Sequence, residues 1–278
     1  MKNAMGSSPS AKRPYTVKSL GRALNILELL AEGEESAYSI TQLSRRLHLP
    51  VSTVHRLLAN LVRHGFAEAV PGTHAFRLSF KMLRMGLRVL DGLDFRFTAQ
   101  PLLQELNQRT QETVHLAILQ GTRAICIEKF EGPRPVGLDA SPGKMMPLHC
   151  TAVGKILMAY QRVAFLTEVA RAAGLRRFTP HTISSLANLR KEREQIREQG
   201  YALEQEEAAM GLRCVAGPLF DHNGRVVAAF GVAGPATRLT PARLPKIVNL
   251  VRATSKQISF RLGHRRQTRR WAGGQMGR

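Results

Sequence analysis

The pattern of apolar and polar positions is clearest between Pro50 and Gly65, in the segment PVSTVHRLLANLVRHG. Its apolar residues recur at the spacing of one helical face: Val54, Leu57, Leu58 and Leu61. The opposite face carries hydroxyl, amide, imidazole and guanidinium groups and no carboxylate: Ser52, Thr53, His55, Arg56, Asn60 and Arg63. Such a face suits a polyanion with hydrogen-bonding edges, such as duplex DNA, although an ordinary solvated helix has the same apolar stripe. Pro50 fits the start of this helix and Gly65 fits its end.

Two more helices are predicted before this segment. Residues 17–31 carry a stripe of leucine and alanine, and Ser39 with Gln42 forms a capping-box pattern that opens a short helix. Because only His48 and Leu49 separate that short helix from Pro50, the three helices follow the order of a helix-turn-helix. In that motif the last helix enters the major groove of DNA.

The residues after Gly65 extend this interpretation. Two short strand-like runs, 66–70 and 75–78, flank a Pro-Gly turn and predict a β-hairpin, which completes a winged helix. Residues 79–93 then predict a helix that connects two domains. Its methionine-rich stripe is more typical of a core or dimer contact than of a cofactor site.

From about Asp94 the pattern alternates between helices and strands. We expect helices at residues 99–111, 151–160, 162–173, 184–199 and 241–262. We expect strands at residues 114–120, 123–130, 136–140, 201–206, 213–220 and 225–233, with a loop at 141–147. This order is typical of an α/β domain.

Charge is the strongest feature of the composition. The 278 residues contain 41 Lys and Arg against 20 Asp and Glu, a net charge of +21 that favours nucleic acid or another anionic partner. No apolar run has the length of a membrane span, and the N-terminus lacks the apolar segment of a signal peptide. Three widely spaced cysteines, without the pairing of a disulfide framework or a metal site, indicate a reducing cytoplasm.

Both ends of the chain are basic and low in apolar residues. Residues 1–16 are expected to form a disordered tail, or else a basic arm that touches phosphates. Residues 263–278 contain five arginines and no acid, so a second disordered tail with non-specific DNA affinity is expected there.

Six sequence blocks resemble those of the IclR-type bacterial transcription regulators, in the same order and spacing. They read SLGRAL at 19–24, LPVSTVHRLL at 49–58, ETVH at 112–115, PLHCTAVGK at 147–155, GLRC at 211–214 and Gly234-Pro235. The resemblance runs from about Val17 to Leu262. It implies an α+β chain with a winged helix-turn-helix at 17–78, a linker helix at 79–93 and a C-terminal α/β effector domain similar to the GAF fold at 94–262. It also implies a homodimer, often a dimer of dimers, bound to double-stranded DNA at a palindromic operator.

By this resemblance the Pro50 helix is the recognition helix. Its candidate DNA contacts are Ser52, Thr53, His55 and Arg56, where Arg56 suits a fork to guanine and Ser52 either contacts DNA or caps the helix. Candidate phosphate contacts are Arg22, Arg45 and Arg46, although Arg46 equally fits a solvated position. Thr73 and His74 lie at the predicted wing tip, where we expect the DNA backbone or the minor groove.

The resemblance also implies a cup that binds a small carboxylic acid. The positions carried over by motif are Ala152, Val153, Glu204, Cys214, Gly231 and Ala233. Backbone N–H groups at the start of the 151–160 helix suit a carboxylate. Lys155 and Arg213 are further candidate charge partners, with no direction fixed by the sequence.

This chain departs from some family members at two of these positions. Those members place serines at the positions of Gly231 and Ala233, where they hold a small hydrophilic acid, and an aspartate at that of Glu204. Two apolar residues here predict a larger, partly apolar acid, a class that includes aromatic acids, while tight strand packing is an alternative reason for their small size.

Two other classes of protein share some of these features. A thiol-dependent enzyme with a nucleic-acid-binding N-terminal domain would use Cys150 or Cys214 with His149 or His115. Adjacent residues of an extended segment point apart, so His149 is poorly placed to activate Cys150, and the chain has no nucleophile elbow, phosphate loop or HExxH motif. We therefore expect no catalytic, metal or cofactor site. A non-specific architectural protein fits the charge but leaves the α/β half unexplained.

Overall fold

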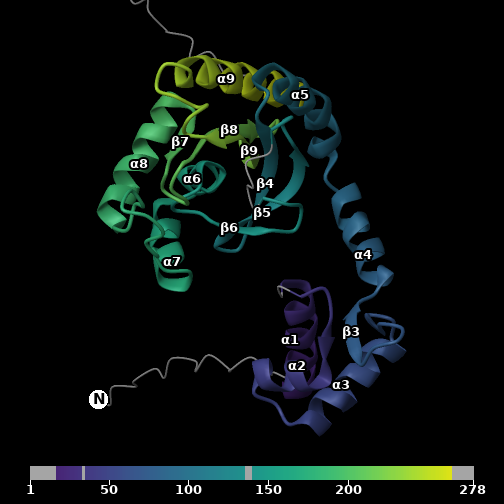
Figure 1. Cartoon of the computed structure of the whole chain (residues 1–278). Helices are drawn as coiled ribbons and strands as arrows, with labels where there is room; N and C mark the ends of the chain where they lie inside the picture. The colour runs from purple at the N-terminus through teal and green to yellow at the C-terminus, as the bar shows by residue number, and fades with distance from the viewer. Residues whose placement is uncertain (1–16, 33–34, 135–139, 265–278) are drawn as a thin grey trace, which may run out of the picture. The chain divides into compact units, whose positions relative to one another are not determined.

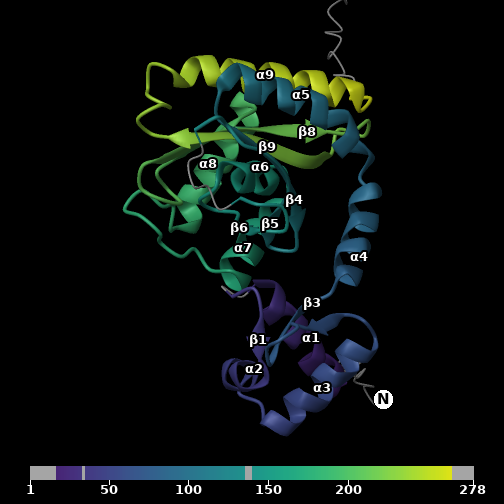
Figure 2. The ribbon, with the colours of Figure 1, turned by 45° about the vertical axis from the view of Figure 1, so that its right-hand side comes forward.

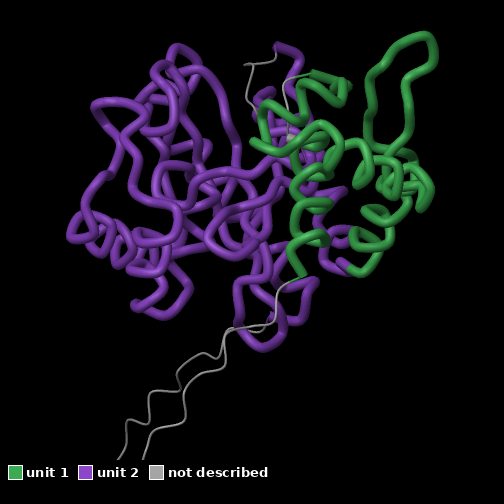
Figure 3. Tube along the Cα trace, turned by 90° about the horizontal axis from the view of Figure 1, so that it is seen from below, with its two compact units in different colours: residues 1–92 green, residues 93–278 purple. Residues whose placement is uncertain are grey.

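A computed structural model describes residues 17–32, 35–134 and 140–264 of the chain. The chain divides into two compact units, residues 1–92 and 93–278 (Figure 3). The predicted tail at 1–16, the C-terminal tail beyond residue 264 and all but the last residue of the strand predicted at 136–140 lie outside the described residues.

Unit 1 contains the three predicted helices and the hairpin. Helices α1 (Lys18–Glu32), α2 (Ile40–Leu47) and α3 (Val51–Arg63) are followed by strands β2 (Ala67–Ala69) and β3 (Ala75–Leu78). A two-residue strand, β1 (Tyr38–Ser39), pairs with β3 and gives the order β1-β3-β2. A strand this short has no alternating pattern, so the sequence did not predict it.

Local hydrogen bonds fix the ends of α2 and α3. The side chain of Ser39 accepts from the backbone of Gln42 and the Gln42 side chain accepts from the Ser39 backbone, so the predicted capping box is present. The turn into α3 needs a left-handed residue, which is His48 at φ 52°. At the other end Gly65 has φ 73°, and Phe66 N donates to Leu61 O at 2.8 Å, which is the Schellman closure of a helix.

Helix α4 (Phe80–Asp91) matches the predicted connecting helix, and Ser79 caps its N-terminus. None of its residues is buried within this chain. Several large apolar side chains are left exposed on it: Phe80, Leu83, Met85, Leu87 and Val89. The stripe read from the sequence therefore does not pack into the core of either unit.

Unit 2 is built on one antiparallel sheet of six strands in the order β6-β5-β4-β9-β8-β7. Its strands are β4 (Thr113–Gln120), β5 (Arg123–Phe130), β6 (Met145–Pro147), β7 (Ala202–Gln205), β8 (Leu212–Phe220) and β9 (Val226–Pro235). Helices α5 (Asp94–Thr110) and α9 (Leu244–Arg261) lie side by side on one face (Figures 1 and 2). The other face curls around α6 (Ala152–Ala159), with α7 (Val163–Ala172) and α8 (Leu186–Gln199) outside it.

Two predicted boundaries in unit 2 are wrong. Helix α5 begins at Asp94, five residues before the predicted start, and carries Pro101 in its interior rather than in its first turn. The predicted loop at 141–147 contains strand β6, which pairs with β5 through Arg123 and Pro147. That strand is held by its neighbour and is too short to show a pattern of its own.

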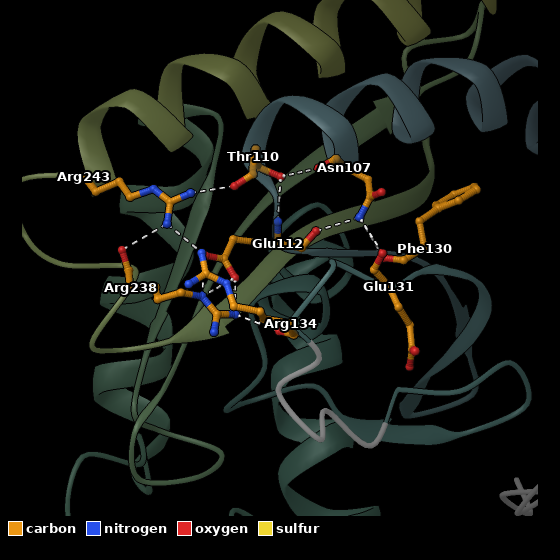
Figure 4. Close-up of polar contacts among 8 residues, drawn as sticks. All are labelled: Asn107, Thr110, Glu112, Phe130, Glu131, Arg134, Arg238 and Arg243. Atoms are coloured by element: carbon orange, nitrogen blue, oxygen red, sulfur yellow. Dashed lines mark hydrogen bonds and ion pairs between the residues drawn. The ribbon is translucent and has the colours of Figure 1, made fainter.

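A buried carboxylate joins three segments of unit 2 (Figure 4). Glu112 lies between α5 and β4 and is 1% exposed. Its two oxygens accept from Arg238 at 2.6 to 3.2 Å and from Arg243 at 2.8 Å. Arg243 also donates to Thr110 O at 2.5 Å, at the end of α5. The start of α9 is thereby fixed to the junction of α5 and β4, which sets how the helical layer covers the sheet.

Candidate functional site

Two candidate sites emerge, one in each unit. In unit 1, α3 buries Val54, Leu58 and Leu61 and turns its other side to solvent. Ser52, His55 and Arg56 are exposed and Thr53 is half-buried. The helix cap is Pro50, without a side-chain hydrogen bond, so the alternative role of Ser52 as the cap is excluded. The exposed side of α3 contains no carboxylate, which leaves its donors available to an anionic surface.

The other predicted DNA contacts are also on the surface of unit 1. Arg22, Arg45, Arg46, Thr73 and His74 are all exposed. The Arg46 guanidinium lies 5.2 Å from the centre of the Tyr38 ring, a cation–π contact that holds it on the protein. The Thr73 hydroxyl donates to Val70 O at 2.9 Å and accepts from Ala75 N, so it shapes the wing turn.

Unit 2 contains a cavity of about 440 Å³ between the sheet and the start of α6, here called the α6 cavity. Apolar residues dominate its wall: Met145, Met146, Pro147, Ala152, Phe178, Ala208, Ala209, Met210, Leu212, Ala233 and Pro235. The polar or ionisable residues of the wall are His115, Lys144, Cys150, Thr151, Glu204 and Cys214. This volume and this composition are typical of a small-molecule site.

Strand register explains the floor of the α6 cavity. Glu204 on β7 pairs with Cys214 on β8, which pairs with Ala233 on β9. Paired residues on neighbouring strands point to the same face of a sheet. His115 on β4 stands two residues along from the partner of Ala233 and therefore faces the same side.

The first turn of α6 forms the opposite wall. Thr151 caps the helix: its hydroxyl accepts from Gly154 N at 3.2 Å and donates to Pro147 O at 2.6 Å. Cys150, Thr151 and Ala152 line the cavity, so the positive end of the helix faces it. Backbone N–H groups at such an end suit an anion.

Glu204 brings a carboxylate to this cavity, and one of its oxygens has no hydrogen-bond partner in the part of the chain that the structure describes. Its Oε1 accepts from Glu207 N at 2.7 Å and from Ala208 N at 3.1 Å. Its Oε2 is buried and has no partner among the described residues. Burial raises the pKa of Glu204 to about 7, against the two backbone N–H groups, which lower it. Glu204 is therefore a group that can hold a proton at neutral pH.

His115 and the thiols are neutral groups in this environment. Burial, with Lys129 nearby, lowers the pKa of His115 to about 4. Burial raises the pKa of Cys126 to about 11 and that of Cys150 to about 12, and raises the pKa of Cys214 as well. His149 bonds through Nε2 to Arg176 O at 3.0 Å. A nucleophilic cysteine needs its thiolate, which these surroundings disfavour.

Four of the six predicted effector residues line the α6 cavity: Ala152, Glu204, Cys214 and Ala233. Val153 and Gly231 are not part of the wall; Val153 is buried, with its Cγ1 beside Gly231. A Cβ at Gly231 would stand 2.8 Å from Cys214 Sγ and 3.0 Å from His115 Cε1, closer than side chains pack. Tight packing therefore explains the absence of a side chain at Gly231, whereas Ala233 is part of the wall.

The two candidate charge partners face elsewhere. Lys155 is 1% exposed and forms ion pairs with Glu192 at 2.9 Å and Glu207 at 2.6 Å. Arg213 donates to Leu239 O at 3.0 Å and pairs with Glu206. Neither side chain is therefore directed to a ligand in the α6 cavity.

Sequence reasoning missed several wall residues, including Phe178 and Met210. They stand in irregular segments without periodicity, so no local signal marks them. Two threonine hydroxyls position the first segment: Thr179 donates to Glu206 O and Thr182 donates to Glu207 O, both at 2.6 Å. The two accepting carbonyls lie 27 and 25 residues further along the chain than the threonines.

Comparison with known proteins decides the family. A family model of the bacterial transcriptional regulator IclR C-terminal domain matches residues 87–260, and one of the IclR helix-turn-helix domain matches residues 19–71. The chain belongs to the IclR family. Its predicted α+β architecture, with a helix-turn-helix unit followed by an α/β unit around a curled sheet, is confirmed.

Individual IclR-family relatives agree over nearly the whole chain. The regulator XynR of Escherichia coli K12 is 36% identical over 248 residues, which cover 89% of this chain and 98% of XynR. The crystal structure of Thermotoga maritima IclR matches with a TM-score of 0.71 and 29% identity, over 88% of this chain and 99% of that one. An IclR homologue of Microbacterium hydrocarbonoxydans, crystallised with 4-hydroxybenzoate, matches with a TM-score of 0.77 and 25% identity, over 88% and 99%.

This IclR-family chain is therefore a DNA-binding transcriptional regulator and not an enzyme. The thiol-enzyme alternative is excluded by the same comparisons. In the described part of the chain, no helix combines the length and the apolar character needed to cross a membrane.

The raised pKa of Glu204 has a consequence for stability. The folded chain keeps the Glu204 proton up to about pH 7, whereas the unfolded chain loses it near the usual glutamate value. The Glu204 proton therefore contributes about 3 kcal/mol to the free energy of unfolding at low pH. This contribution is lost as pH rises from the unfolded-state pKa through about 7. We expect Glu204→Gln to flatten the fall of the melting temperature between about pH 5 and about pH 8, measured by scanning calorimetry.

Glu105→Gln is the matched control, since Glu105 is exposed and pairs with Arg109 on the surface. It should keep the pH dependence of the wild type. An identical pH dependence in the wild type and in Glu204→Gln would show that Glu204 titrates normally.

Proposed function

We propose that a partly apolar, aromatic carboxylic acid binds in the α6 cavity and controls the affinity of this regulator for its operator. The observation that carries the proposal is the cavity itself: about 440 Å³, apolar over most of its wall, with a helix N-terminus facing it. The homologue crystallised with 4-hydroxybenzoate supports the same ligand class.

The wall chemistry favours a ring over a two-carbon acid. A compact acid such as glyoxylate gains from hydroxyl groups, whereas this cavity offers Ala233, Met210 and Phe178. Apolar surface removed from water contributes about 25 cal/mol per Å², so an aromatic ring gains most from these side chains. The ligand carboxylate is placed at the N–H groups of the first turn of α6.

The protonation state of Glu204 affects the binding of the ligand carboxylate. A ligand carboxylate at α6 lies in the same cavity as Glu204, and two negative charges at close range disfavour each other. A protonated Glu204 removes that repulsion and can donate to the ligand. We therefore infer that binding of the anion is accompanied by retention of the Glu204 proton.

The DNA end of the proposal is the exposed side of α3. Arg56 is assigned to a base edge, together with Ser52, Thr53 and His55, and Arg22, Arg45 and Arg46 to phosphates. Thr73 and His74 are assigned to the wing contact.

We further propose a homodimer, or a dimer of dimers, on a palindromic operator in the bacterial cytoplasm, where the DNA lies. Large apolar side chains left exposed on α4, and Leu20 and Leu24 on α1, support a contact with a second copy. An operator read by a symmetric dimer has two related half-sites.

Titration calorimetry of the full chain against a series of acids tests the ligand class. Benzoate, 4-hydroxybenzoate and phenylacetate should bind at least ten times more tightly than glyoxylate or pyruvate, because only the former bury a ring. Binding should strengthen as pH falls below about 7, where Glu204 is protonated. Binding of glyoxylate or pyruvate without binding of the aromatic acids would overturn the proposal.

Base recognition by Arg56 is tested on an operator selected from random duplexes by the wild-type chain. Arg56→Ala should weaken operator binding roughly 10- to 100-fold, with a much smaller loss on unrelated duplex, because a bidentate contact to a base contributes about 1–3 kcal/mol. Arg171→Ala, at an exposed position of α7, serves as control. An equal loss on operator and unrelated duplex would assign Arg56 to phosphate instead.

A further inference from the structure

Most of the excess positive charge of this chain lies outside the helix-turn-helix unit. Residues 93–278 contain 28 Lys and Arg against 14 Asp and Glu, so they contribute +14 of the net charge of +21. A cavity for one carboxylate does not require it, since the described part of the cavity wall contains three ionisable side chains besides its two thiols: His115, Lys144 and Glu204. The charge of unit 2 therefore points to a second role.

Helix α9 concentrates part of this charge on one surface. Its 18 residues, LPKIVNLVRATSKQISFR, include no Asp or Glu. Ile247, Val251 and Ile258 are buried against the sheet. The cations are exposed on the other side and are here called the α9 basic face: Lys246, Arg252, Lys256 and Arg261. The face extends roughly 22 Å along the helix, at about 1.5 Å per residue.

The elements beside α9 do not neutralise this face. Helix α5 lies alongside α9 (Figures 1 and 2) and carries two exposed carboxylates, Asp94 and Glu105. Glu105 pairs with Arg109 at 3.3 Å, and Asp94 forms no ion pair with a described cation of α9. In the turn before β9, Asp221 accepts from the backbone of Asn223 and Arg225 at 2.9 and 2.8 Å. Among the described residues, none of the four cations of the α9 basic face takes part in an ion pair.

The segment that follows α9 is also basic. Residues 263–278 add five arginines and no acid. An ordinary solvated helix mixes its charges, as α8 does with four cations and three glutamates over Leu186–Gln199. The bias of α9 is therefore a property of that helix rather than of unit 2 as a whole.

We propose that the α9 basic face binds the phosphate backbone of duplex DNA and gives the effector-binding unit a sequence-independent DNA contact of its own. Lys and Arg without preset carboxylate partners suit a polyanion of uniform charge. The chain is a DNA-binding regulator, and unit 2 is joined covalently to the unit that carries the helix-turn-helix. A tethered second contact acts at a high effective concentration, and even weak phosphate contacts then add to affinity.

The test replaces charge on α9 while keeping its helix. The variant Lys246→Gln/Arg252→Gln/Lys256→Gln removes three cations, and glutamine is a good helix former. Its matched control is Arg171→Gln/Arg190→Gln/Lys191→Gln, which removes three exposed cations from α7 and α8. Lys246→Arg/Lys256→Arg preserves the charge. Melting curves establish that all the variants are folded.

Fluorescence anisotropy of the full-length chains on a mixed-sequence duplex is measured between about 50 and about 200 mM salt. The α9 triple variant should lower the slope of log affinity against log salt by about 3, since each phosphate contact contributes roughly one unit. The control triple variant and the charge-preserving variant should keep the wild-type slope. The preference for a selected operator over mixed sequence should remain within about twofold.

Equal slopes for the α9 triple variant and its control would overturn the proposal. Flotation with phosphatidylglycerol vesicles supplies the other arm. Loss of vesicle binding in the α9 triple variant, with an unchanged salt slope on DNA, would assign the face to an anionic membrane and overturn the DNA assignment.

Discussion

The rest of unit 2 depends on the ion pairs that the buried Glu112 carboxylate forms with Arg238 and Arg243. Glu112 is 1% exposed and would be costly to bury alone, but two guanidinium groups pair with it, and backbone carbonyls accept the remaining N–H groups of those arginines (Figure 4). Arg238 lies between β9 and α9, Arg243 caps α9, and Glu112 immediately precedes β4, so the same charges fix both layers of the unit. Gly234 is required beside them, since a Cβ there would stand 2.6 Å from Glu112 Oε2. The α6 cavity forms on the opposite face of the sheet that this network holds.

Residue patterns predicted much of this architecture, for physical reasons that can be named. The stripe Val54–Leu61 and the Ser39–Gln42 box follow local rules, so α2 and α3 were placed within a residue or two. Strands β1 and β6 were missed because they are two and three residues long and depend on a neighbour. In the cavity, motif residues placed Glu204, Cys214 and Ala233 correctly on the wall, whereas Phe178 and Met210 come from irregular segments held by distant contacts. The unpaired oxygen of Glu204 is a property of the assembled site and has no local sequence signal.

The two units differ in the chemistry that they present to a ligand. Unit 1 presents donors without carboxylates, which suits DNA, and unit 2 encloses an apolar cavity with one helix N-terminus, which suits an organic acid. The net charge of +14 on residues 93–278 links the second unit to the same polyanion. Regulation then requires a free-energy difference between DNA-competent and DNA-incompetent forms that the ligand shifts. The ligand acts only through its different affinity for those forms.

Reciprocal coupling is the most direct test of this account. The operator affinity of the full chain is measured with and without a saturating aromatic acid, and the affinity for that acid is measured with and without saturating operator. Because both quantities report one coupling free energy, the two ratios must agree, and a regulatory ligand is expected to give a factor of about 5 to about 150. Two ratios equal to one, with the acid bound, would show a ligand that occupies the α6 cavity without controlling DNA binding, and would contradict the account.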